Sequence, residues 1–307
     1  WDVYQLIPML MALGIAVVTT FLAMRTWRLL GVENLSFYRF NLKSSGVMRK
    51  AGWAFLSFAL LWLGLNIHSG WIRYHESAGA RAFESIRIPD ELALAQTNPA
   101  RWLSATDREN IAAGEKHFYT AFDTGLFLNK PALSKLAWIE YLSGDTEQAV
   151  RLLDRAVEHQ EGESKVLSLY YRGAILNRLG RYEQGLASLE QALAERPDLI
   201  AAHEEKGESL WQLGRRQEAV SAWNEAVRRN ANLTLANNLL AGAAASMGQH
   251  EAAAAYEKQA EQSTPADPLF YWIVGLRLEN AGMNELAEKH FQRAIQLNPE
   301  FKRARRN

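Results

Sequence analysis

The chain has 307 residues, 48% of them hydrophobic and 22% charged, and its 34 Lys and Arg balance its 34 Asp and Glu. This size and composition suit one or two folded domains, and they exclude a disordered tail, a disulfide-stapled miniprotein and a globally basic nucleic-acid binder. The absence of cysteine excludes disulfides, thiolate metal sites, iron–sulfur ligation and a cysteine nucleophile within the chain.

Two uncharged stretches near the N-terminus predict a membrane anchor over residues 1–72. Residues 3–24 carry no charge, and as a helix they are roughly 33 Å long, enough to span a bilayer. Residues 51–72 form the second stretch, which has charged residues at both ends and three tryptophans where interfacial aromatics are often found. Buried helices of this length usually show a polar stripe, so we expect two transmembrane helices.

The loop between these helices, residues 25–50, is basic. Glu33 is its one acid, against Arg25, Arg28, Arg39, Lys43, Arg49 and Lys50. Short loops with this bias stay in the cytoplasm, which predicts a two-pass protein of the inner (plasma) membrane with both termini outside, in the periplasm. The run from Phe37 to Lys43 is either an interfacial strap on anionic headgroups or an ordinary cytoplasmic loop.

Residues 73–129 are expected to connect the anchor to the rest of the chain. Residues 73–108 contain Pro89 and Pro99 and little periodicity, which is typical of a juxtamembrane connector with short helices. Residues 109–129 have small and bulky side chains at the spacing of a second helix of the repeats described next, but no clear first helix. We interpret them as a half repeat that caps the array.

A repeat of 34 residues follows, marked by Gly180, Gly214, Gly248 and Gly282. Each unit has small residues at two further positions: Gly185, Ala219, Ala253 and Ala287 at the first, and Ala192, Ala226, Ala260 and Ala294 at the second. This pattern predicts a helical hairpin, because glycine ends the first helix in a left-handed turn and the small residues let the second helix approach its neighbours.

The pattern resembles the tetratricopeptide-repeat (TPR) family, which implies an all-α fold, an α-solenoid of about five helical hairpins. The units are framed at 130–163, 166–199, 200–233, 234–267 and 268–301, so the repeat domain covers 130–301 and leaves a basic tail at 302–307. The chain shows no phosphate-binding loop, no zinc-protease motif and no nucleophile elbow. We therefore expect no enzyme activity, no catalytic residues, no cofactor and no metal.

The resemblance also implies a concave groove, lined by the first helix of each unit, that binds a protein partner. Carried over to this sequence, the groove residues are Trp138, Tyr141, Tyr170, Asn177, Arg178, Glu204, Glu208, Trp211, Asn238 and Trp272. The alternative is that some of these rings belong to the core between repeats. An aromatic and acidic groove favours a basic or amphipathic partner segment.

Three functions fit these features. The first is a membrane-tethered scaffold whose exported repeats mediate protein–protein interaction or assembly of a membrane complex, with protein partners, the lipid bilayer and no nucleic acid. The second is the apocytochrome-holding chaperone of c-type cytochrome maturation, whose topology is similar. The third is the C-terminal part of a polytopic, polyferredoxin-like redox protein. Because Trp1 stands where Met would begin a chain, we expect a processed or cut form, or the tail of a longer membrane protein.

Overall fold

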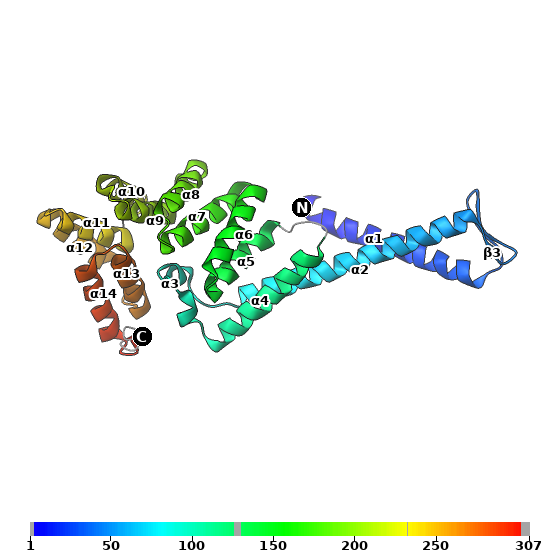
Figure 1. Ribbon diagram of the computed structural model, residues 1–307, viewed down its shortest axis with the longest axis horizontal. Helices are drawn as coiled ribbons and strands as arrows, with labels where there is room; N and C mark the ends of the chain where they lie inside the picture. Colours follow the sequence, from blue (N-terminus) through cyan, green and yellow to red (C-terminus); the bar gives the residue numbers. More distant parts are fainter. Residues whose placement is uncertain (1–2, 126–129, 232, 302–307) are drawn as a thin grey trace. The chain divides into compact units, whose positions relative to one another are not determined.

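The computed structural model describes residues 3–125, 130–231 and 233–301, which are mostly helical (Figure 1). They form two compact units that divide between His75 and Glu76. The predicted basic tail, residues 302–307, and the last four residues of the predicted half repeat, 126–129, lie outside the described residues.

In the first unit, the two apolar stretches lie within longer helices, α1 (Val3–Gly31) and α2 (Lys50–Glu84). Both helices are long and apolar enough to cross a membrane. Large apolar side chains such as Leu13, Met24, Leu60 and Ile67 are more than 60% exposed, because little of the protein covers them. The two helices contact each other through the Trp62 indole of α2, which donates a 3.0 Å hydrogen bond to the Thr19 hydroxyl of α1. Leu22 of α1 and Ala59 of α2 are buried.

The basic loop folds into a small antiparallel sheet that joins the ends of α1 and α2 (Figure 1). Its strands are β1 (Leu35–Phe37), β2 (Phe40–Ser44) and β3 (Val47–Met48), paired in that order. Leu35 and Leu42 point inward and pack with Leu29 of α1 as a small buried core. The segment is therefore a regular three-stranded meander, and Lys43 of β2 donates a hydrogen bond to the Leu29 carbonyl in the last turn of α1.

The second unit begins with the end of α2, which continues through residues expected to form a connector. After it come α3 (Asp90–Leu94), a 3₁₀ turn η1 (Pro99–Trp102) and α4 (Ala105–Thr124), which starts at a capping box between Ser104 and Asp107. α4 packs on the end of α2, since a Cβ at Gly79 would lie 3.0 Å from the Phe118 ring. The half repeat thus pairs with a helix that sequence reasoning did not assign to it.

Ten further helices form the repeat array in five hairpins, which confirms the predicted all-α solenoid (Figure 1). The glycines that end the first helices have left-handed backbone torsions, with φ of 72° at Gly180 and 76° at Gly214. The helices are α5 (Lys130–Ser143), α6 (Thr146–His159), α7 (Gly162–Arg178), α8 (Tyr182–Glu195), α9 (Ile200–Gln212), α10 (Arg216–Arg229), α11 (Thr234–Ser246), α12 (His250–Ser263), α13 (Pro268–Asn280) and α14 (Asn284–Leu297).

Close packing within each hairpin explains the small residues of the repeat. The Trp223 ring of α10 lies against Gly207 of α9, where a Cβ would come within 2.2 Å of the indole nitrogen. Phe291 of α14 takes the same place against Gly275 of α13. Ala219 and Ala226 are fully buried on the same face as Trp223, so a larger side chain at either position has no room.

Candidate functional site

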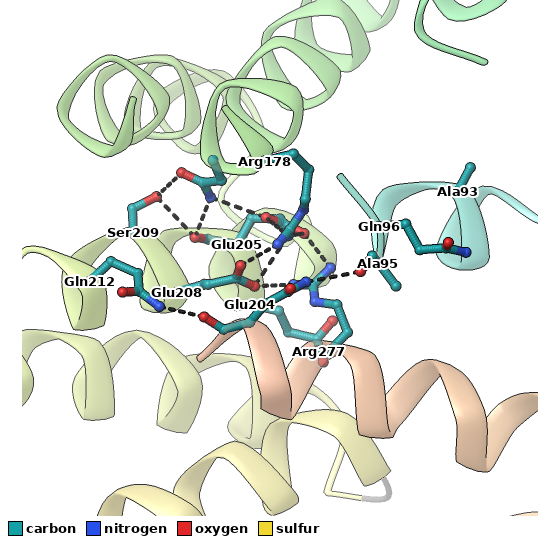
Figure 2. A network of polar contacts seen from close by, with 12 residues as sticks. Ala93, Ala95, Gln96, Arg178, Glu204, Glu205, Glu208, Ser209, Gln212 and Arg277 are labelled. Atoms are coloured by element: carbon teal, nitrogen blue, oxygen red, sulfur yellow. Dashed lines mark hydrogen bonds and ion pairs between the residues drawn. The ribbon is translucent and has the colours of Figure 1, made fainter. Parts of the chain in front are cut away.

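Two arginines and two glutamates from three first helices form a buried ionic cluster (Figure 2). Arg178 ends α7, Glu205 and Glu208 lie on α9, and Arg277 lies on α13. Arg178 Nη2 is 2.9 Å from Glu205 Oε2 and 3.2 Å from Glu208 Oε2. Arg277 Nη2 is 3.0 Å from Glu208 Oε2, and its Nη1 pairs with Glu205. No side chain of the four is more than 7% exposed.

The two positive and two negative charges of the cluster balance. Burial by itself would raise the pKa of the Glu208 carboxyl, but Arg178 and Arg277 lower it below its ordinary range. Glu208 is therefore an ionised structural residue and not an accessible acid of the groove. Arg178 and Asn177, also predicted for the groove, serve the same cluster, since Asn177 Nδ2 donates 3.1 Å hydrogen bonds to the backbone oxygen and a carboxylate oxygen of Glu205.

Glu204, one residue before Glu205, has a different role from Glu208, although both were predicted as groove residues. Its pKa is raised to about 7 by burial, and the attraction of Arg277 offsets this only in part. The nearby carboxylates Glu205 and Glu208 raise the Glu204 pKa further, and so oppose the attraction of Arg277.

The concave side of the array already holds a segment of its own chain, α3 and the residues that follow it. The Tyr141 hydroxyl of α5 lies 2.9 Å from both the Ala93 and the Gln96 carbonyl oxygens, which share its one proton as acceptors. Asn280 of α13 donates a 2.9 Å hydrogen bond to the Ala95 carbonyl. These side chains donate to backbone carbonyls at the C-terminal end of a short helix, as the side chains of a peptide-binding groove do for a ligand.

Apolar contacts hold the same segment in place. Leu92 is buried with the core of the later repeats and Leu94 with that of the earlier ones. The Tyr171 hydroxyl donates a 2.8 Å hydrogen bond to the Asp90 carboxylate at the start of α3. Further along, the ring centroids of Trp102 and Trp272 are 5.8 Å apart. Predicted groove residues Tyr141 and Trp272 thus bind the chain itself.

The C-terminal hairpin closes against the middle of the array. The Trp211 indole at the end of α9 donates a 2.9 Å hydrogen bond to the Ala281 carbonyl just after α13. Trp138 is half-buried beside Tyr141, with ring centroids 5.4 Å apart, and lines a separate cavity of about 280 Å³. These contacts leave neither indole fully open to a partner.

Asn238 on α11 is not brought to this surface. It is buried, and its Oδ1 lies 2.9 Å from Nε2 of His290 on α14. Burial lowers the pKa of His290 to about 4, so the neutral ring donates to the amide oxygen at pH 7.

One part of the concave side stays open, a cavity of about 740 Å³ that contains the two remaining predicted residues, Tyr170 and Glu204. Its apolar lining comes mainly from Leu94, Leu233, Leu235, Leu269, Phe270, Ile273 and Val274. Acidic side chains also line it: Asp90, Glu91, Glu204, Glu205 and Asp267. Arg277 is the one basic residue among the cavity's lining residues, and its guanidinium is ion-paired with Glu205 and Glu208.

Sequence reasoning missed Arg277, Glu205, Tyr171 and the segment 90–96. Arg277, Glu205 and Tyr171 lie at repeat positions that do not usually line the groove. Their place within the repeat therefore did not indicate a functional role. The segment did carry one, a short apolar run that follows Pro89 and opens with Asp90 and Glu91, which is a helix start placed between two prolines.

The tetratricopeptide-repeat family profile matches residues 134–200 and 204–268. The array is a tetratricopeptide-repeat domain. No curated protein matches the chain. Among solved structures, a MamA crystal structure is 22% identical and covers 55% of this chain and 97% of its own, with a TM-score of 0.41. A MamA mutant is 16% identical and covers 64% of this chain and 94% of its own, with a TM-score of 0.48. MamA from Desulfovibrio magneticus RS-1 is 21% identical and covers 56% of this chain and 97% of its own, with a TM-score of 0.42.

TPR domains bind other proteins, so the repeat match makes this array a protein-interaction scaffold. The two N-terminal helices add a part that is long and apolar enough to cross a membrane.

Proposed function

We propose that the chain is a two-pass scaffold of the inner membrane, whose exported TPR domain holds a protein partner or assembles subunits of a membrane complex. Its role is binding and not catalysis. The N- and C-termini lie outside the cytoplasm, and the β1–β3 sheet lies inside. The exposed apolar surface of α1 and α2 supports the tether, since large uncovered apolar surfaces are rare on soluble proteins.

The open cavity of about 740 Å³ is the proposed partner site, and its composition carries the proposal. Its apolar lining offers contact area to a partner side chain, and its carboxylates favour a cation. A segment that combines apolar side chains with a Lys or Arg fits both features. The neighbouring α3 supports this assignment, because the same concave side already binds a short helix through side-chain hydrogen bonds to its carbonyls.

Site-specific photocrosslinking in the cells that make the protein tests this site. A photoreactive benzoylphenylalanine replaces Phe270 in the cavity of the full chain, and a matched position is Asn224, which is exposed on α10. We expect a discrete adduct from position 270 and none of the same mass from position 224. Combining the probe with Glu204→Gln should reduce the yield, because the substitution removes the carboxylate that attracts the partner's cation.

Two results would contradict the proposal. If both positions give the same adducts, the cavity has no particular role in binding. If the position 270 adduct keeps its yield with Glu204→Gln and with Glu204→Lys, the partner is not recognised by its positive charge.

A further inference from the structure

The turn between β1 and β2 folds back along α1 within the first unit. Lys43, paired with Leu35 at the start of β1, donates a 3.2 Å hydrogen bond from Nζ to the Leu29 carbonyl in the last turn of α1. At the other end of β1, the Phe37 ring lies 5.8 Å from the ring of Phe21. From Leu35 to Phe37, β1 therefore runs back from the end of α1 toward its apolar part.

That level of α1 is the edge of the predicted membrane span. Residues 3–24 carry no charge, and Arg25 is the first charged residue after them. The Arg25 guanidinium carbon lies 5.6 Å from the Phe21 ring centroid and 5.5 Å from that of Phe37. The turn thus lies beside the residue at which the apolar helix reaches the headgroup region of a bilayer.

The turn presents two uncovered rings and a cation at this level. Tyr38 is 83% exposed and Phe40 is 61% exposed. The Arg39 guanidinium carbon lies 5.4 Å from the Tyr38 ring centroid. Tyr38 also has a left-handed backbone, with φ of 54°, where glycine or asparagine would be favoured. Tyr38 is therefore a large aromatic residue in a backbone conformation that favours glycine or asparagine.

We propose that the turn of residues 37–40, together with Arg25, is a binding site for the headgroups of anionic phospholipids. Tyr38 and Phe40 insert at the boundary between headgroups and acyl chains, where amphipathic aromatic rings are favoured. Arg25 and Arg39 contact rings and have guanidinium donors for lipid phosphate, which planar arginine binds well. This inference rests on the membrane tether of the proposed function but not on the groove of the TPR domain.

The chain contains no cysteine, so single cysteines can report the depth of chosen positions in the full chain. Tyr38→Cys tests the site, and Ser45→Cys is the matched control, since Ser45 is also an exposed turn residue with a left-handed backbone. Ser45 lies near the other end of the meander, where its amide donates a 2.7 Å hydrogen bond to Asn34. Leu60→Cys, on the exposed apolar face of α2, reports insertion itself.

Each variant carries the fluorophore NBD and is reconstituted into vesicles of phosphatidylcholine with phosphatidylglycerol, containing lipids with nitroxide quenchers in the headgroup region or deep in the acyl chains. We expect deep quenching at position 60, shallow quenching at position 38 and weak quenching at position 45. Similar quenching at 38 and 45, with position 60 quenched, overturns the headgroup site alone. Absence of quenching at position 60 overturns the membrane tether and the headgroup site with it.

A second measurement addresses the charge of the lipid. Native mass spectrometry of the full chain counts phosphatidylglycerol adducts in the presence of excess phosphatidylcholine. Arg25→Gln and Arg39→Gln should each lower the preference for phosphatidylglycerol about fivefold, whereas Arg28→Gln, on α1 but outside the proposed site, should change it less. Equal effects of the three substitutions would overturn specific headgroup binding, and competition by inorganic phosphate alone would show an anion site that does not select lipid.

Discussion

Arg277→Met removes one of the two positive charges from the ionic cluster and keeps a side chain of similar length. In the parent, Arg277 contacts both Glu205 and Glu208, and Arg178 contacts the same two carboxylates. After the substitution, Arg178 alone faces two carboxylates in a site where the side chains are almost fully buried. The cluster then carries a net negative charge that has no access to solvent.

Removing one partner of a buried ion pair costs about 3–5 kcal/mol, because the charge that remains is uncompensated. For a domain of this size a loss of 1 kcal/mol lowers the unfolding temperature by about 2–4 °C, so a shift on the order of 10 °C is expected. The effect should depend on pH. In the parent, the pKa of Glu208 is lowered, so its stabilisation is present above its ordinary pKa and is lost as the pH falls. In the variant a carboxyl is destabilised as the anion, so the defect should shrink as the pH falls.

The assay is thermal unfolding of the full chain in detergent, followed by tryptophan fluorescence at several pH values. Arg215→Met is the matched control, since Arg215 forms an exposed pair with Glu218 and its loss should give no measurable shift. Adding Glu208→Gln to Arg277→Met restores charge balance and should recover part of the loss. If Arg277→Met and Arg215→Met unfold at the same temperature, or if Glu208→Gln makes the defect larger, the cluster does not stabilise the array as argued.

Three further outcomes are expected. Ala219→Leu should overpack the fully buried site and cost about 1–3 kcal/mol, whereas Ser221→Leu on the exposed face should be tolerated; equal unfolding temperatures would contradict the packing argument. The raised pKa of Glu204 makes stability fall as the pH rises from 4.5 to about 7, so Glu204→Gln should flatten that part of the stability–pH curve. Single cysteines at Ser45 and Gln262 should react oppositely with an impermeant thiol reagent in intact cells, with only position 262 labelled, and equal labelling would refute the proposed topology.

The repeat was predictable because its signal is local. A glycine every 34 residues marks the place where a first helix ends, and the observed φ of 72–76° at Gly180, Gly214, Gly248 and Gly282 shows the conformation that selects it. The small residue Gly185 in the second helix α8 has an equally direct cause, since a Cβ there would lie 2.5 Å from Asn177 Oδ1 and 3.0 Å from the Gly173 carbonyl oxygen of α7. Because each rule involves residues close together in the chain, it can be recognised from one sequence.

The use of the groove residues was not predictable from the same signal. Arg277 on α13 reaches Glu205 and Glu208 on α9, two repeats away, and this contact depends on the curvature of the whole array. The repeat frame gives each residue a position within its own unit, but it does not say how far the superhelix closes. It therefore identified Glu204 and Glu208 as equivalent acids, although curvature buries one in the ionic cluster and places the other at the open cavity.

A similar limit applies to the connector. The residues after the membrane span were expected to form a connector with short helices, but α2 continues to Glu84 as the partner of α4. Charged residues such as Arg73 and Glu76 mark where an apolar span ends and do not end a helix. The hydropathy pattern could therefore predict the span and could not predict the helix boundary.

Because α3 and the closing contact of α13 on α9 occupy much of the concave side, the shape of the proposed partner site depends on contacts already made within the chain. The Tyr141 and Asn280 hydrogen bonds hold α3 as one wall of the cavity, and the pairing of Arg277 with Glu205 and Glu208 holds α13 as another. A preformed cavity loses less conformational entropy when a partner binds than a groove that must close around it. The acids buried in the cluster would then contribute to affinity by keeping the cavity in shape, and Glu204 would contribute by its charge. The two roles are separable, since Arg277→Met should weaken both folding and partner binding, whereas Glu204→Gln should weaken binding without lowering stability at neutral pH.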